Sequence, residues 1–446
     1  MFSSALVPLF LEFSRNFYRP THRRFLLLVG AAILTVGRRT VSNMLRTAGG
    51  LVLGHPSSYH RFFSKRTWSL WPLGRALAQH VLERYYPAGE VPTVVDDTVD
   101  GHKGAKVYGK GCHRDAVRST HSYTAFRWGH KWVVLCILVK FPWASRLWAL
   151  PVLIALYRSE KWNKQHGRRH KTPPELARQL LAVLLHWFPE RKFTLAGDGG
   201  FSTHDLAAAA YRRRSQATFV GRFYAKANLF GWPPKRRSRK GGRPRLKGRK
   251  LAVPKNVVKR SKRRRLQVSW YGGGLRRVEV VSGTGLWYKA GQGVVEVRWV
   301  FVHDLDGTHR DEYFFSTDAT MTPKEIIETF TGRWSIEVTF EEMRAHLGLE
   351  TTRGRTEKTV LRAAPCLFGL YSVVALAYAA LPKRQAQAGR VEWLGKTETT
   401  FSDAIAAVRQ QLWRNWVFKQ GTHAQAFAKL PPSTQAFLLA SLAPAA

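Results

Sequence analysis

Acidic residues are scarce in this chain of 446 residues, which has 29 Asp and Glu against 72 Lys and Arg. The formal net charge is +43 and the pI is near 11.0. Such an excess of positive charge favours a polyanionic partner, and DNA or RNA ahead of a membrane surface. The hydrophobic content of 45% excludes a disordered chain, and the length allows two to four domains.

Cysteine is also rare, with only Cys112, Cys136 and Cys366. Their spacing matches no cysteine metal site, and an odd number leaves no complete disulfide set. We therefore expect three small buried apolar residues in a reducing cytoplasm.

Long hydrophobic runs are few. The run Phe25–Val36 has twelve residues, too short to span a bilayer, and Arg38 and Arg39 follow it instead of a cleavage site. The run Ala363–Leu381 is long enough but contains a proline and a glycine, so we interpret it as a buried core helix. We expect a soluble, nucleoid-associated protein of the cytoplasm with no membrane partner.

The amino-terminal residues 1–90 have a helical pattern with 12 Lys and Arg against 3 Glu. Arg24–Val36 and Thr40–Thr47 predict two helices separated by a turn at Gly37. This outline resembles a helix-turn-helix, although ordinary helical hairpins share it.

Near Val91 the sequence pattern changes from helical to strand-like. Short buried strands are predicted at 93–95, 193–196 and 217–222, and a hairpin at 123–139 with its turn at Gly129-His130. With the helices between them, this order is that of a ribonuclease H-like core. The predicted fold class is therefore α/β, with a mixed sheet flanked by helices. The expected domains are 1–90, helical and DNA-binding; 91–222 with 322–382, catalytic; 223–321, a basic β-rich insertion; and 383–446, helical.

The insertion contains a dense basic run, Lys235–Arg265, with 17 Lys and Arg in 31 residues and no acid. Its density favours phosphate contact over a merely solvated loop. Two hairpins are predicted after it, at 267–282 and 294–316. The candidate DNA-binding residues of the run are Lys235, Arg236, Arg237, Arg243, Arg245, Lys262, Arg263, Arg264 and Arg265.

One helix is predicted from Thr322 to about Leu347, with a capping box and a proline at its start. At about 100° per residue, positions 330, 333, 337 and 344 fall within an arc of about 60°. Ile336, Phe340, Met343 and Leu347 form an apolar stripe beside it. The helix is therefore predicted to bury one face and to offer Glu337 between Arg333 and Arg344 on the next.

Two strand-end aspartates and this glutamate make a carboxylate trio, Asp97, Asp198 and Glu337. Hard oxygen ligands of this kind suit two Mg²⁺ ions, with Mn²⁺ as a substitute. An aspartate at a strand end is commonly only a turn cap. Asp96 and Asp97 point to opposite faces of a strand, so the residues alone leave the first ligand open.

These motifs resemble the DDE transposases of bacterial insertion sequences, in the branch with a β-rich insertion before the glutamate helix. Phe330, Arg333, Glu337 and Arg344 fall at the spacings of its Y-(2)-R-(3)-E-(6)-K signature. Val95-Asp96-Asp97-Thr98 and Ala196-Gly197-Asp198-Gly199 look like its two aspartate strands, and Asp97 directly before Thr is the better match. The resemblance covers about residues 90–380. Phe replaces the signature's Tyr and Arg its Lys, which changes phosphate handling rather than metal binding.

The resemblance implies a transposase that cuts the inverted-repeat ends of a mobile element and joins the freed 3′-OH to target DNA. Asp97, Asp198 and Glu337 would hold Mg²⁺, while Phe330, Arg333 and Arg344 would contact DNA. A homodimer in a synaptic complex on double-stranded DNA is implied as well. Two alternatives are a catalytically silent nucleic-acid-binding descendant and a nuclease of the same fold.

Several other residues have two interpretations. His102, Lys103 and His113 are either DNA contacts or ordinary loop residues near the first aspartate. Trp287 and Trp299 either stack on an unpaired base or pack in a core.

Overall fold

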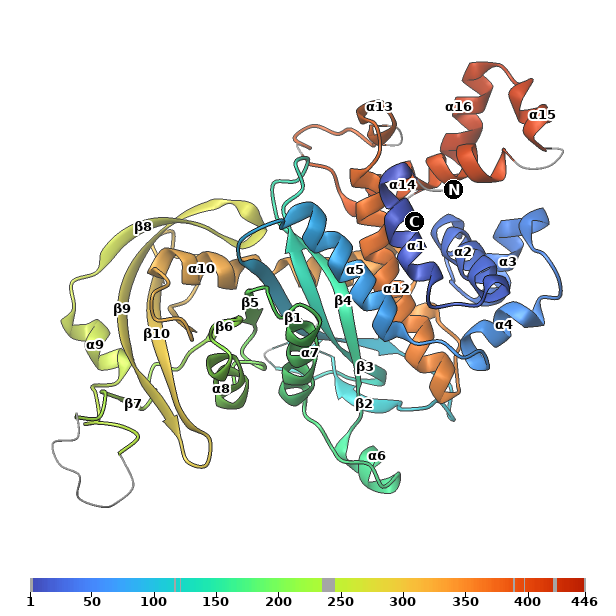
Figure 1. Ribbon diagram of the computed structural model, residues 1–446. Coiled ribbons are helices and arrows are strands. Elements are labelled where there is room, and N and C mark those ends of the chain that lie inside the picture. Colours follow the sequence, from blue (N-terminus) through green and yellow to red (C-terminus); the bar gives the residue numbers. More distant parts are fainter. Residues whose placement is uncertain are drawn as a thin grey trace.

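The computed structural model describes residues 3–115, 118–120, 122–234, 245–387, 390–396, 398–419 and 423–444. A mixed sheet lies at its centre, with the insertion on the left and the amino- and carboxyl-terminal helices on the right in Figure 1. Within the described residues, eleven strands join in this one sheet.

Outside the insertion, the main part of the sheet has the strand order β4-β3-β1-β5-β6. Strands β4, β3 and β1 are antiparallel neighbours, and β1, β5 and β6 are parallel neighbours. This is the arrangement of a ribonuclease H-like core, which confirms the predicted fold class. The strands are β1 (Val91–Gly101), β3 (Phe126–Val139), β4 (Trp148–Tyr157), β5 (Phe193–Gly197) and β6 (Ala217–Arg222). The connecting helices are α6 (Glu160–Gln165), α7 (Pro173–Trp187) and α8 (His204–Arg212).

The predicted hairpin at Gly129-His130 is wrong, because β3 runs through both residues without a turn. Gly129 lies opposite Gly101 of β1, where a Cβ atom would come within 1.6 Å of the Asp100 carbonyl oxygen. The glycine therefore permits close strand approach rather than a reversal of the chain. The third core strand is β4, which the sequence pattern did not separate, and β2 (Gly111–Arg114) pairs with the first residues of β3.

The insertion extends the same sheet. Strand β11 pairs antiparallel with β6, with Phe315 opposite Gly221, and β10 and β9 follow outward. The two predicted hairpins are present as β8–β9 and β10–β11. The elements of the insertion are β7 (Leu229–Phe230), α9 (Pro254–Arg260), β8 (Arg264–Ser269), a 3₁₀ turn (Tyr271–Gly273), β9 (Leu275–Lys289), β10 (Gly293–Asp304) and β11 (Glu312–Ser316).

The predicted helix-turn-helix outline corresponds to α2 (Arg19–Leu34) and α3 (Val41–Ala48). The Thr40 side chain caps α3 by accepting from the Asn43 amide, and Arg46 is exposed on its surface. The other amino-terminal elements are a 3₁₀ turn (Ser4–Leu6), α1 (Val7–Ser14), a second 3₁₀ turn (Gly49–Leu51), α4 (Ser57–Ser64) and α5 (Leu70–Tyr85).

The amino- and carboxyl-terminal helices share one hydrophobic core with the sheet, which includes Phe62, Leu135, Phe368 and Val408. Buried Arg409 binds the end of α2, where its Nε donates to the Ile33 carbonyl at 2.7 Å. The core thus crosses the domain boundaries expected at residues 90 and 382. The carboxyl-terminal elements are α10 (Pro323–Gly332), α11 (Ser335–His346), a 3₁₀ turn (Leu349–Thr351), α12 (Glu357–Ala379), α13 (Lys383–Ala386), α14 (Phe401–Leu412), a π-helical turn (Trp413–Val417), α15 (His423–Ala428) and α16 (Pro432–Ser441).

Helix α12 is long and apolar enough to cross a membrane by length and composition alone. In the described structure, however, 78% of its apolar window is buried. Its residues pack on β4 and α14, and the Ser372 hydroxyl donates to the Pro151 carbonyl at 2.9 Å. The expected core helix is present.

Candidate active site at the ends of β1 and β5

The two strand-end aspartates come together through the parallel pairing of β1 and β5. Val95 lies opposite Gly197, so the next residues, Asp96 and Asp198, follow at the same edge. Asp198 Oδ1 accepts from the amides of Gly200 and Phe201 at 2.9 and 3.1 Å, so this carboxylate caps a turn as well as facing Asp96. The turn fixes the direction of the Asp198 side chain.

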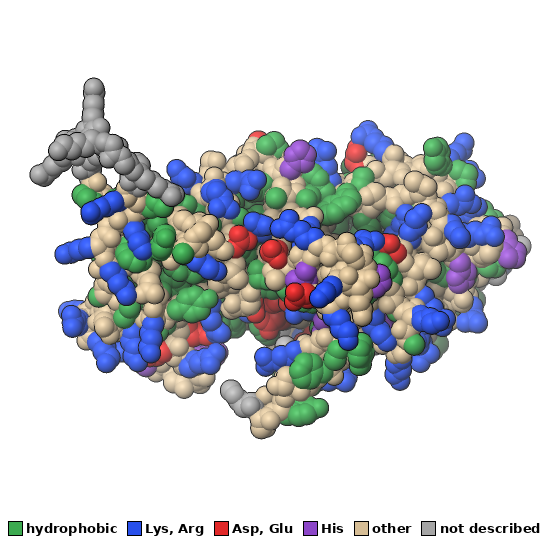
Figure 2. Space-filling model, turned by 90° about the horizontal axis from the view of Figure 1, so that it is seen from below, with side chains coloured by type: hydrophobic (Ala, Val, Ile, Leu, Met, Phe, Trp, Pro, Cys, Tyr) green, Lys and Arg blue, Asp and Glu red, His purple; other side chains and the backbone are tan. Residues whose placement is uncertain are grey.

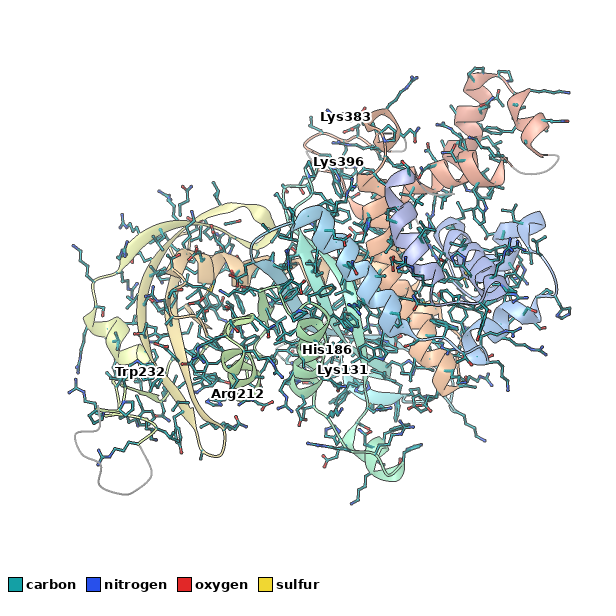
Figure 3. All side chains as sticks on the ribbon, viewed as in Figure 1. Lys131, His186, Arg212, Trp232, Lys383 and Lys396 are labelled. Carbon is teal, nitrogen blue, oxygen red and sulfur yellow. The ribbon has the colours of Figure 1, made fainter. Side chains whose placement is uncertain are left out.

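Asp97, the expected first ligand, points to the other face of β1. Its Oδ1 forms an ion pair with Lys131 Nζ at 2.9 Å, and Lys131 lies on β3 near the middle of the molecule (Figure 3). Asp96, Thr98 and Asp100 share the opposite face, since side chains alternate along a strand. The charge of Asp198 also reaches Asp97, but Asp96 is the aspartate that bonds Arg333, so we propose Asp96 in place of Asp97 as the first member of the trio.

The glutamate helix is divided at Arg333-Trp334 into α10 and α11. The amides of Arg333, Trp334, Ile336 and Glu337 bond to the carbonyl three residues earlier, which tightens the chain to a 3₁₀-like turn. Below it, Ile336, Phe340, Met343 and Leu347 are buried, as the apolar stripe predicted. The turn places Arg333 and Glu337 over the end of β1.

Arg333 bridges two of the three carboxylates. Its Nη1 lies 3.0 Å from Asp96 Oδ2, and its Nη2 lies 2.8 Å from Glu337 Oε1. The Arg333 side chain is 9% exposed, whereas that of Glu337 is 47% exposed. The guanidinium thus supplies positive charge between Asp96 and Glu337, which otherwise would repel each other.

The electrostatics of Asp96 fit a cation site. Burial, with the neighbouring charges of Asp198 and Asp97, raises the pKa of Asp96 to about 8, although Arg333 opposes the shift. Burial also raises the pKa of Asp97, and Lys131 opposes that shift. A divalent cation would offset the repulsion between buried carboxylates that are crowded in this way.

The raised pKa of Asp96 gives a testable pH dependence. Its folded-state pKa lies above its unfolded value, so folding favours the protonated acid and this contribution is lost as pH rises from about 4 to about 8. In magnesium-free buffer, the melting temperature of Asp96→Asn relative to wild type should be higher at pH 8.5 than at pH 5.5 by about 2 °C or more. Thermal unfolding at both pH values measures this, with Glu190→Gln, at an exposed site, as the control. A constant difference for Asp96→Asn would contradict it.

Phe330 and Arg344, two residues of the signature, contact other residues of the protein and are not freely exposed. Phe330, expected to contact DNA, is 2% exposed and stacks on Phe314 with ring centroids 4.2 Å apart. The tightened turn separates it from the arc of Glu337 and turns it into the core beneath the insertion strands. Arg344 is half-buried, contacts the Thr98 hydroxyl and lies 3.6 Å from Glu350 Oε1.

Of the remaining predicted residues, some are buried, some are exposed and some lie outside the described part of the chain. Trp287 and Trp299 are buried at 9% and 2%, so packing is their role. His113 is buried and the His102 side chain is 8% exposed, which argues against DNA contacts by these two, whereas Lys103 is exposed and its DNA contact stays a prediction. Lys235, Arg236, Arg237 and Arg243 lie outside the described residues. Exposed members of the basic run are Arg245, Lys262, Arg263, Arg264 and Arg265.

The structure also shows two features that sequence reasoning missed. Lys131 is the partner of Asp97, and nothing in its local sequence indicated this. A cavity of about 1340 Å³ lies between the amino-terminal helices, β4 and α12, and Asp96, Asp198 and Glu337 do not line it. Asp96 and Asp198 instead lie at the carboxyl ends of β1 and β5. Figure 2 shows Lys and Arg side chains scattered over one face of the molecule, with several Asp and Glu side chains near its middle.

Comparisons with known proteins define the class of this fold and site. Residues 12–277 match the family described as DDE superfamily endonuclease, and residues 281–363 match the family described as Archaeal putative transposase ISC1217. The first match covers more than half of the sequence, so the chain belongs to the DDE superfamily endonuclease family.

One solved structure is similar in outline. It is a piggyBac transposase synaptic complex with hairpin DNA, with a TM-score of 0.41 and 10% identity over 98% of this chain and 81% of that chain. No curated protein matches the sequence.

Proposed function

We propose that the protein is a DNA transposase of the insertion-sequence type, which cuts transposon ends and joins the 3′-OH to target DNA. The observation that carries the proposal is that Arg333 binds both Asp96 and Glu337, at 3.0 and 2.8 Å, beside Asp198 at the carboxyl ends of β1 and β5. Family membership supports the cleavage step, because the family is one of endonucleases. The spacing of Arg333 and Glu337 supports the insertion-sequence branch.

In this proposal Asp96, Asp198 and Glu337 hold two Mg²⁺ ions, with Mn²⁺ as a substitute. The donor set is all carboxylate oxygen, which suits these hard cations. When bound, the ions activate the attacking oxygen and stabilise the leaving one. Arg333 turns toward the scissile phosphate when metal takes over the charge of Asp96 and Glu337, and its planar fork then orients that phosphate.

Exposed basic residues of the insertion supply the DNA contact. Arg245 and the row Lys262–Arg265 are exposed, and Trp232 is 63% exposed directly before the basic run. Figure 3 labels Trp232 at the end of the insertion, far from the terminal helices. We propose that two copies bind paired transposon ends in this way, in a synaptic complex on the nucleoid in the cytoplasm.

Neutralising the insertion should change the salt dependence of DNA binding. The triple variant Arg245→Gln, Lys262→Gln, Arg264→Gln should lower the slope of log affinity against log salt by up to about 2.7, at about 0.9 for each phosphate contact. Fluorescence anisotropy on a duplex between 50 and 200 mM salt measures it. Lys383→Gln with Arg384→Gln, on exposed α13, is the control. An unchanged slope in the triple variant would show that these residues are only solvated.

The proposed function is tested with full-length protein, Mg²⁺ and duplexes that carry the terminal sequences flanking its gene. We expect a nick that leaves a 3′-OH at the terminal repeat, followed by joined products with a target plasmid. Binding without cleavage would favour a catalytically silent binding protein. Cleavage without joining would favour a nuclease of the same fold.

A further inference from the structure

A second cluster of ligand-type side chains lies on the same face of β1, beyond the carboxylate site. Asp100 ends this face, His102 follows β1 directly, and His130 lies opposite Asp100 on β3. One ligand atom from each residue lies within 4.8 Å of the others, and all three residues are buried. Among the described residues, it is the one such group of three His, Cys, Asp or Glu.

Each histidine ring faces a different oxygen of Asp100, at a distance longer than an ordinary hydrogen bond. His102 Nε2 lies 3.7 Å from Asp100 Oδ2, and His130 Nδ1 lies 3.5 Å from Asp100 Oδ1. Both distances exceed the 2.7–3.2 Å of an ordinary N–H···O bond. Two ligands of a tetrahedral zinc ion, each about 2.0–2.1 Å from the metal, lie roughly 3.3–3.4 Å apart.

The histidine nitrogens that face Asp100 are left without hydrogen bonds. His102 Nε2 and His130 Nδ1 are buried and have no hydrogen-bond partner in the described structure. The other nitrogen of His130, Nε2, lies 2.9 Å from the Tyr108 carbonyl oxygen and can only donate to it. A ligating histidine commonly donates its second N–H to a backbone carbonyl in this way, which leaves the first nitrogen as a lone pair for the metal.

The carboxylate is held in place by separate donors. Asp100 Oδ1 accepts from the His130 amide at 3.0 Å, and Oδ2 accepts from Trp132 Nε1 at 3.1 Å. Burial alone would raise the pKa of Asp100, but the neighbouring His102 and His130 rings hold it well below its usual value. The His130 amide and the Trp132 indole therefore fix the direction of the carboxylate.

A cluster without metal leaves these groups poorly satisfied. The His102 and His130 rings are 4.5 Å apart, so two imidazolium ions would repel each other. Because His130 Nε2 donates to the Tyr108 carbonyl, a neutral His130 directs the lone pair of its buried Nδ1 at the Asp100 carboxylate. A divalent cation satisfies both lone pairs and the carboxylate together.

We propose that Asp100, His102 and His130 bind one structural zinc ion, with water as the fourth ligand. Two imidazoles and one carboxylate suit zinc, whereas Mg²⁺ prefers oxygen ligands alone. The ion would fasten the end of β1 and the following loop to β3. Asp96 and Thr98 lie on the same face of β1, so the ion would also fix the strand that carries the first catalytic carboxylate. This site does not depend on the proposed function.

The test is the zinc content of full-length protein after reconstitution with zinc and dialysis without chelator. Mass spectrometry of the metal should give about one zinc per chain for wild type, and His102→Ala and His130→Ala should each lose it. His55→Ala, at an exposed site, and Glu337→Gln should both keep it. Wild type with less than about 0.2 zinc per chain, or Glu337→Gln without zinc, would overturn the proposal.

A second measurement covers the case in which the histidine variants do not fold. Wild type reconstituted with Co²⁺ should show the visible absorption of a tetrahedral cobalt site, and Glu337→Gln should show the same spectrum. Zinc should also raise the melting temperature of wild type. A cobalt spectrum of octahedral type, or none, would contradict the proposed site.

Discussion

Asp96→Asn should reduce strand cleavage by at least about 10³-fold, whereas Asp97→Asn should leave it within a few-fold of wild type. The reason is the alternation of side chains along β1. Asp96 lies beside Asp198 and is linked to Glu337 through Arg333, while Asp97 pairs with Lys131 on the other face. The two substitutions are adjacent and chemically identical, so each is the matched control of the other.

The measurement is single-turnover cleavage of an end duplex with Mg²⁺, beside an anisotropy measurement of end binding. Asp198→Asn and Glu337→Gln should lose cleavage as Asp96→Asn does. All three should keep end binding within a few-fold, since metal ligands serve the reaction more than DNA docking. If Asp97→Asn were inactive and Asp96→Asn active, the assignment of the first ligand to Asp96 would be wrong.

Arg333→Ala should reduce cleavage by about 10²-fold or more and leave Mn²⁺ binding to the free protein at least as tight as in wild type. The guanidinium bonds Asp96 and Glu337, so its removal frees two proposed ligands while it deletes a phosphate contact. Arg333→Lys should restore part of the rate, because the charge returns without the bidentate geometry.

Paramagnetic resonance of Mn²⁺ and single-turnover cleavage separate the two effects of Arg333. Asp96→Asn is the contrast, since it should lose both Mn²⁺ binding and cleavage. Because Arg333 is buried, a melting curve of each variant is needed to show that it folds. Cleavage by Arg333→Ala at the normal rate would reduce Arg333 to a structural partner of Asp96 and Glu337.

Much of the fold could be predicted because its signals are local. The capping box at Thr322 and the apolar stripe from Ile336 to Leu347 mark a helix wherever it packs. The predictions that failed concern contacts between residues that are far apart in the chain. Gly129-His130 has the residues of a turn, yet Gly129 serves the close approach of β1 and β3, which are separated in the chain by residues 102–125.

The candidate site, too, could be predicted from the sequence only in part. Its residue types and spacings, with Asp198 after a buried strand and Arg333 four residues before Glu337, are properties of the sequence. The choice between Asp96 and Asp97 required the face of β1 that α11 covers. The fate of Phe330 required the tightened turn at Arg333-Trp334, which moves this ring into the core against Phe314.

The sequence by itself indicated a polyanionic partner, the α/β fold class and the carboxylates available for metal. These follow from net charge and from periodicities within single elements. Only the tertiary structure decided which aspartate faces Glu337, which arginine neutralises it, and that Asp100, His102 and His130 meet. Those outcomes depend on strand register and helix packing, and side chains that converge from separate strands and helices leave no periodic signal in the chain.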